Sequence, residues 1–163
     1  MKIIIKLIRL YLSAWLGNAN AQNDIGCMYS TGNEVSQDHT KALNWFRRAA
    51  EQGHADAQRN MGLIYYLGIG VIADCVRAAT WFRFAAEQGE ARSQNHLGCM
   101  YYIGRGVTQD YVQAYMWLSL AAVQGNMHAQ NNKNEIECTL SFGQLLEARI
   151  LAFNWKPDKT KES

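Results

Sequence analysis

Apolar side chains in the middle of the chain recur with the spacing of one helix face. They occupy positions i, i+4, i+7 and i+8, which is the pattern of an amphipathic helix. These positions are Ala57, Met61, Ile64 and Tyr65. Gly62 lies beside this face. Because a glycine inside a helix costs about 1 kcal/mol against alanine, we expect a partner helix to approach closely there.

A second amphipathic helix is predicted from about Val76 to Gln88. Between the two helices, Gly68 and Gly70 supply the positive φ that a short loop needs. Asp74 directly precedes the second helix and can accept hydrogen bonds from its first backbone N–H groups. Small and aromatic side chains share one face of this helix, which we expect to be buried. They are Ala78, Trp81, Phe82, Ala85 and Ala86.

The same pair of helices recurs along the chain at a fixed interval. Trp45, Trp81 and Trp117 follow one another every 36 residues, with no insertion between copies. A period in this range is typical of a solenoid, in which each unit is too small to bury its own apolar face and stacks on the next. We therefore predict an all-α fold, a right-handed α/α superhelix of antiparallel helix pairs, with the three tryptophans as structural residues.

The period also predicts where the units begin and end. Residues 126–155 are expected to form a partial repeat followed by a capping helix, because Ser141 and Gln144 have the spacing of a capping box. The apolar side predicted for that last helix consists of Leu145, Leu146, Ile150 and Leu151. The complete division is 1–17 (half-repeat or signal-like segment), 18–53, 54–89 and 90–125 (repeats), 126–155, and 156–163 (disordered tail).

The repeated sequence pattern resembles that of a known family. One copy opens with Ala55-Asp56-Ala57-Gln58 and continues through Met61-Gly62 and Tyr65 to the loop, and the second helix ends at Gly89. This pattern is similar to the Sel-one-like repeat, a bacterial branch of the tetratricopeptide-like helical solenoids, over about residues 19 to 130. The resemblance implies a scaffold that binds other proteins in a groove lined by the first helix of each pair. Glu34 departs from the pattern, since later copies have glycine there.

The N-terminus can be interpreted in two ways. Residues 1–21 resemble a signal peptide, with basic residues, an apolar run and a small-residue cleavage site. Yet the segment from Gly17 to Gln22 is in repeat register with the segment from Gly53 to Gln58, which favours the worn second helix of an earlier unit. A cytoplasmic location is slightly favoured on this reading, and a periplasmic or secreted one on the other. Lys6 and Arg9 interrupt the apolar run, so no stable membrane span is predicted.

Composition adds few constraints on function. The net charge of +2 is too small to indicate a nucleic-acid partner. Four cysteines lack a CxxC pair and are expected to be small buried or half-buried thiols. His96 and Cys99 could share a helix face, but two ligands do not make a zinc site. We therefore expect no metal and no cofactor.

The sequence contains no G-x-S-x-G, no S-x-x-K, no phosphate-binding loop and no HExxH motif. A non-enzymatic role is therefore predicted. The alternative comes from the resemblance, because some secreted or periplasmic relatives are described as β-lactam-binding or weakly hydrolysing. Their characteristic cysteine positions hold alanine here, at Ala50, Ala86 and Ala122 among others, which argues against that subgroup.

Candidate binding residues lie on the first helix of each pair, opposite the predicted core. At 100° per residue, Arg59, Leu63 and Tyr66 point away from Ala57 and Met61. In the resembling solenoids the equivalent positions line the concave groove, and these slots vary here while the core slots barely change. A peptide or protein segment is the predicted partner, and the oligomeric state is left open. The predicted stripe is Asn23, Cys27, Ser30, Asp56, Arg59, Leu63, Tyr66, Arg92, Asn95, Cys99, Tyr102 and Asn131.

Overall fold

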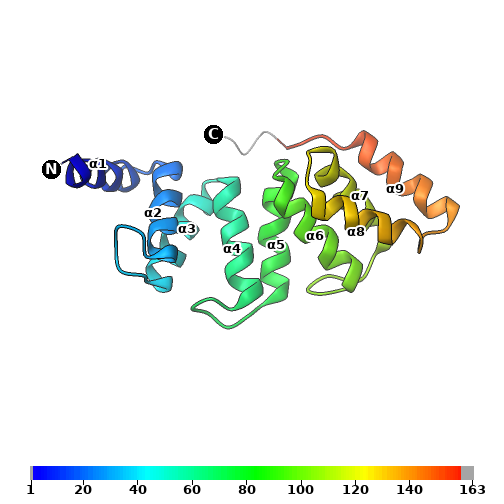
Figure 1. Cartoon of the computed structure of the whole chain (residues 1–163), viewed down its shortest axis with the longest axis horizontal. Helices are drawn as coiled ribbons and strands as arrows, with labels where there is room; N and C mark the ends of the chain where they lie inside the picture. Colours follow the sequence, from blue (N-terminus) through cyan, green and yellow to red (C-terminus); the bar gives the residue numbers. More distant parts are fainter. Residues whose placement is uncertain (1, 159–163) are drawn as a thin grey trace.

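The computed structural model describes residues 2–158, and within that range every element of secondary structure is an α-helix. The helices stack one after another along a single long axis, with α1 at one end and α9 at the other (Figure 1). The predicted all-α solenoid is therefore confirmed. The helices are α1 (Lys2–Trp15), α2 (Ala19–Thr31), α3 (His39–Glu51), α4 (Ala55–Leu67), α5 (Cys75–Glu87), α6 (Ala91–Ile103), α7 (Tyr111–Val123), α8 (Met127–Glu137) and α9 (Phe142–Asn154).

Each helix pair begins and ends on residues that the sequence supplies for that purpose. The side chains of Asp38, Asp74 and Asp110 each accept a hydrogen bond from the third backbone N–H of α3, α5 and α7. At the other end, Gly68 and Gly104 adopt the left-handed conformation that closes α4 and α6. These caps fix the length of the helices and hence the equal spacing of the units.

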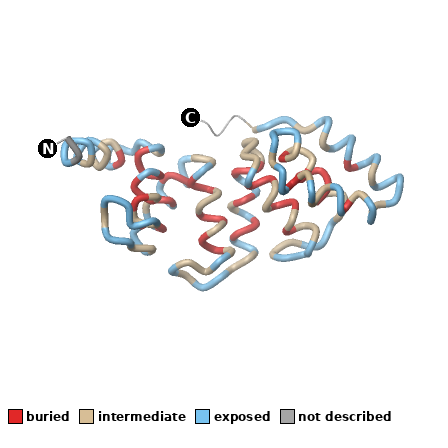
Figure 2. The backbone as a smooth tube through the Cα atoms, in the orientation of Figure 1, coloured by how far each residue is buried: buried red, intermediate tan, exposed pale blue. Residues whose placement is uncertain are grey.

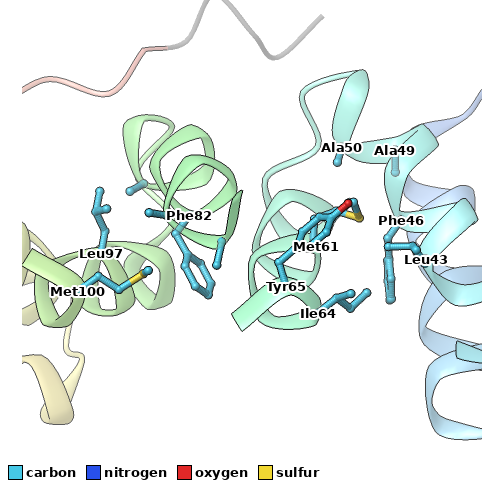
Figure 3. Packing of buried hydrophobic residues seen from close by; sticks show 14 of the residues in the cluster. Leu43, Phe46, Ala49, Ala50, Met61, Ile64, Tyr65, Phe82, Leu97 and Met100 are labelled. Atoms are coloured by element: carbon cyan, nitrogen blue, oxygen red, sulfur yellow. The ribbon is translucent and has the colours of Figure 1, made fainter. Parts of the chain in front are cut away.

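The core lies between successive helices and runs through the whole stack (Figure 2). Figure 3 shows side chains of α3, α4, α5 and α6 meeting in the middle of the array, among them Phe46, Met61 and Phe82. Phe82 and Met61 are fully buried. A Cβ atom at Gly62 would lie 2.6 Å from the Phe82 ring. The expected close approach of the partner helix at Gly62 is thus confirmed.

The prediction that all three repeated tryptophans lie on the buried face is only partly right. Trp117 is 7% exposed, whereas Trp45 and Trp81 are half-buried. The centre of the face belongs to the next residue, Phe46 or Phe82, because that side chain points directly at the glycine of the first helix. The preceding tryptophan is rotated by about 100° and lies at the edge of the face.

Buried glutamines connect each unit to the one before it. The side-chain amide of Gln58 donates to the carbonyl of Ala50 at 3.1 Å, and its oxygen accepts from Gln88 at 2.7 Å. Gln94 makes the same two contacts one repeat later. Gln22 likewise donates to the carbonyl of Ala14, so α1 has the position relative to α2 that α3 has relative to α4. Each amide buried in the seam between units is thereby satisfied.

The first helix of the chain packs on α2 through one side only. Ala14 is buried there, and Tyr11 is hydrogen-bonded to Tyr29. Ile8, Leu12 and Trp15 are exposed on the other side. No helix within residues 2–158 is long and apolar enough to cross a membrane.

The last helix starts at the predicted capping box, which is present at Ser141 and Gln144. Its predicted apolar side is wrong in part. Leu146 and Ile150 are each 50% exposed, and Leu151 is also exposed. Ala148 and its neighbours on the same face are instead the residues that pack against the core, because α9 crosses α7 on its small side chains. The packed residues are Leu145, Ala148, Ala152 and Trp155.

Candidate protein-binding surface

All twelve predicted binding residues lie on α2, α4, α6 and α8, the first helices of successive units. We call this row the first-helix surface. Asp56, Arg92 and Asn131 are exposed, and most of the others are half-buried. Asn23 is only 9% exposed, so its expected place on the outer face is wrong. The reason is that the next first helix covers it.

Asparagine side chains join neighbouring first helices. Nδ2 of Asn60 donates to Oδ1 of Asn23 at 3.2 Å and to Sγ of Cys27 at 3.9 Å. Asn132 repeats this arrangement two units later, donating to Asn95 at 3.5 Å and to Cys99 at 3.1 Å. Part of the predicted stripe therefore holds the array together.

Asn60 and Asn132 were not among the predicted residues. Their recurrence at the same slot of two repeats was the signal in the sequence.

In the middle of the first-helix surface, an ion pair replaces the contact between asparagine side chains. The guanidinium of Arg59 lies 3.0 Å from Asp56 and 3.5 Å from Glu90, and its side chain is 17% exposed. His96 occupies the slot that Asn60 and Asn132 hold in their units. Its ring stacks on Phe82 with the centroids 4.7 Å apart. Burial lowers the pKa of this imidazole, and the negative charge of Glu90, which raises the pKa, only partly offsets this effect.

A hollow of about 560 Å³ opens on the first-helix surface between α6 and α8. It exists there because Asn95 is shorter than Arg59, which spans the corresponding gap one unit earlier. Arg92 and His128 at its rim are exposed, and no carboxylate side chain lines it. The lining consists of Ala91, Arg92, Asn95, His96, Gln124, Gly125, Asn126, Met127 and His128.

Aromatic side chains flank the loop ends of the same helices. The guanidinium of Arg105 lies 4.4 Å from the centroid of the Tyr66 ring and donates to its hydroxyl at 3.1 Å. Arg105 also donates to Sγ of Cys75 at 3.1 Å. Tyr102 packs against Tyr111 with ring centroids 5.7 Å apart. Arg105 lies in a loop, outside the helical spacing from which the stripe was predicted.

The thiols on this surface are neutral packing groups. Burial raises the pKa of Cys27 and of Cys99, which opposes formation of a reactive thiolate. All four cysteines are free, but Cys138 is exposed, so the expectation of a buried or half-buried thiol is wrong for that residue. His96 and Cys99 are engaged by Phe82 and Asn132 respectively. Among residues 2–158 there is no group of three or more His, Cys, Asp or Glu side chains that could hold a metal ion.

Sequence comparison decides the family. The Sel1 repeat model matches residues 19–54, 55–90 and 91–126. The chain belongs to the Sel1 repeat family. Sel1 repeats are generally protein-interaction scaffolds, which agrees with an array whose repeated residues serve packing and helix capping.

Two solved Sel1-type structures are similar to this protein. A Sel1 repeat protein from Oxalobacter formigenes is 35% identical with a TM-score of 0.76, over 80% of this chain and 98% of that one. A protective antigen of uropathogenic Escherichia coli is 32% identical with a TM-score of 0.71, over 90% of this chain and 39% of that one. Cysteine-rich protein B of Helicobacter pylori, at 23% identity, TM-score 0.60 and coverage of 76% and 93%, shares the fold.

A curated relative matches a shorter part of the sequence. The secretory immunoglobulin A-binding protein EsiB of Escherichia coli O6:H1 is 44% identical over 45 residues. The match covers 28% of this chain and spans 9% of the length of that relative.

Proposed function

We propose that this Sel1 repeat protein is a non-enzymatic scaffold that binds an extended or helical segment of another protein on its first-helix surface. The observation that carries the proposal is the hollow between α6 and α8, which lies among predicted stripe residues. It offers amide and imidazole hydrogen-bonding groups beside an exposed guanidinium, the kind of surface on which peptides are held without covalent chemistry.

The charge of the hollow favours an acidic residue in the bound segment. Arg92 is exposed at its rim, and the lining contains no aspartate or glutamate. A carboxylate can form a paired, charge-assisted contact with a guanidinium, which is stronger than a neutral hydrogen bond. The relative EsiB is named for binding secretory immunoglobulin A, which supports a protein as the class of partner.

The test begins with affinity capture of a partner from the native organism, identified by mass spectrometry. Binding of that partner is then measured for Arg92→Ala and His128→Ala combined in one chain, since Asn95 also accepts a hydrogen bond from Asn132 within the array. We expect an affinity loss of about tenfold or more, since a few central residues carry most of the binding free energy. Arg47→Ala is the matched control, because Arg47 is exposed on α3, away from the first-helix surface.

An affinity that stays within about twofold in the double variant, with the helical circular dichroism intact, would place the partner elsewhere. Arg59 and Tyr66 are poor choices for this test. Their side chains pair with Glu90 and Arg105, so their removal would disturb the array as well as the surface.

A further inference from the structure

The residues that follow α9 form an extended segment, which packs on the side of the array formed by the second helices as a bound peptide would. After α9 ends at Asn154, Trp155 is extended and the segment continues in the direction of α9, past α7 toward α5 (Figure 1). The ring of Trp155 meets that of Trp117 edge to face, with centroids 6.2 Å apart. The backbone N–H of Asp158 donates to the carbonyl of Glu87 at 2.8 Å.

Proline and glycine complete this contact. Gly89 is the positive-φ residue that follows α5. A Cβ atom there would lie 3.7 Å from both Pro157 and Trp155, so the segment passes over bare backbone. Residues 156–163 are predicted as a disordered tail, but Lys156–Asp158 are placed against the array, and 159–163 lie outside the described residues. A hollow beside the segment is lined by Gln88, Gly89, Ser119, Leu120, Val123 and Gln124 of the array and by Ala152, Phe153, Trp155 and Pro157. The array residues of this lining form the seat against which the segment packs.

The same seat recurs one unit earlier. Moving back by one repeat replaces Glu87, Gln88, Gly89, Trp117 and Leu120 with Glu51, Gln52, Gly53, Trp81 and Phe84. A hollow of about 280 Å³ is found at this place, lined by Ala50, Glu51, Gln52, Gly53, Gln58, Trp81 and Phe84. We call it the α3–α5 groove. Trp81 is half-buried, whereas Trp117, under Trp155, is 7% exposed.

We propose that the α3–α5 groove binds an extended segment of a different protein that carries tryptophan followed two residues later by proline. The tryptophan ring packs on Trp81, as Trp155 packs on Trp117. The proline passes over Gly53, which has the same positive φ as Gly89, and the next N–H donates to the carbonyl of Glu51. Proline suits the seat because it holds the backbone extended and has no N–H to leave unpaired.

The internal example also argues against a second copy as the source. The C-terminal segment of each chain is already bound in its own seat, and an intramolecular contact has a high effective concentration. A second copy would have to give up that contact to reach the α3–α5 groove. The site lies mainly on α3 and α5 and includes no residue of the first-helix surface. This proposal can therefore be tested independently of the function proposed above.

One side chain distinguishes the two seats. Phe84 meets Trp81 edge to face at 5.7 Å, which is the geometry that Trp155 has with Trp117. The third unit has Leu120 at this position. The bound tryptophan must therefore share Trp81 with the Phe84 ring, and Phe84→Leu should enlarge the seat and strengthen binding.

The probe is a blocked synthetic peptide with the sequence of residues 152–158, Ala-Phe-Asn-Trp-Lys-Pro-Asp. We expect it to bind the full-length chain saturably in calorimetry, and the peptide with alanine in place of tryptophan to show no binding. Trp81→Ala should weaken binding by about tenfold or more. Phe84→Leu should bind several-fold more tightly than the natural chain, and Phe153→Ala, changed outside the groove, should bind equally well.

A second measurement does not depend on whether Trp81→Ala folds. A photo-reactive phenylalanine in place of the peptide's tryptophan should cross-link the natural chain at residues 81–84. Cross-links near Trp117 would mean that the probe only displaces the chain's own segment, and would overturn the proposal, as would no saturation at about 1 mM. Dimers that disappear in Trp155→Ala would identify the segment of a second copy as the occupant and overturn the assignment to a different protein.

Discussion

Glycine is placed inside the first helix of each of the three complete repeats, where its intrinsic helix propensity is poor. A Cβ atom at Gly26 or Gly62 would lie 2.6 Å from the ring of Phe46 or Phe82, and one at Gly98 would lie 2.7 Å from Leu118. Real Cβ atoms do not come so close to a neighbour. The cost of glycine, about 1 kcal/mol, is therefore outweighed by the packing of a large side chain directly against the helix backbone.

This packing predicts opposite effects for two glycine-to-alanine substitutions. Gly62→Ala should lower the free energy of unfolding by about 1–3 kcal/mol, because the added methyl overpacks a core that cannot relax easily. Gly143→Ala should instead raise it, by up to about 1 kcal/mol. Gly143 is also helical, but a Cβ there meets nothing within 4 Å. Urea unfolding measures both, and equal signs would contradict the close approach at Gly62.

At the scale of the element, the second helix has a core residue and an edge residue side by side. Phe82 is fully buried among core side chains, while the neighbouring Trp81 is half-buried. The sequence shows two adjacent aromatic residues repeating together, and a helical face about 100° wide can include either one. The pattern therefore predicts the face but cannot say which aromatic residue is at its centre.

Truncation of the two residues should separate these roles. Phe82→Ala removes a fully buried ring and is expected to cost about 3–5 kcal/mol of unfolding free energy. Trp81→Ala is expected to cost less than half of that, because part of its ring is already in water. Chemical denaturation followed by far-ultraviolet circular dichroism gives both values in one buffer. A larger loss for Trp81→Ala would mean that the tryptophan is the central residue of the face.

Helix positions and caps could be predicted from sequence because they depend on neighbours a few residues apart. Asp74 and Ser141 are examples, and both cap the helices expected of them. The contacts between first helices could not, because Asn60 reaches Asn23 only through the offset between whole units. That offset follows from side-chain volumes in the seam, which a period does not specify. For the candidate surface, the sequence therefore predicted the row of helices but not which members pair with one another.

For the whole molecule, the two ends of the array differ. The glutamine contacts that join the units stop at Gln130, whose amide turns to Asn134 on its own helix. Beyond it, α9 covers α7, and Arg149 reaches the hydroxyl of Tyr115 and the carboxylate of Glu137. In a solenoid each unit is stabilised mainly by its neighbours, so an end needs a closing element. At this end α9 and the segment after it supply that element.

The stability of this end should depend on one ring. Trp155 packs on Trp117 and on the main core cluster, whereas Phe153, two residues earlier, is 89% exposed. Trp155→Ala should raise amide hydrogen exchange in α9 and α7 by about tenfold or more, with little change in α2 and α4, because coupling in a repeat array decays along the stack. Phe153→Ala is the matched control and should leave exchange nearly unchanged. Mass spectrometry of exchanged peptides resolves these helices separately. Uniformly faster exchange along the whole chain would show instead that the units unfold as one cooperative body, and the same result from Phe153→Ala would show that the packed face of α9 is assigned wrongly.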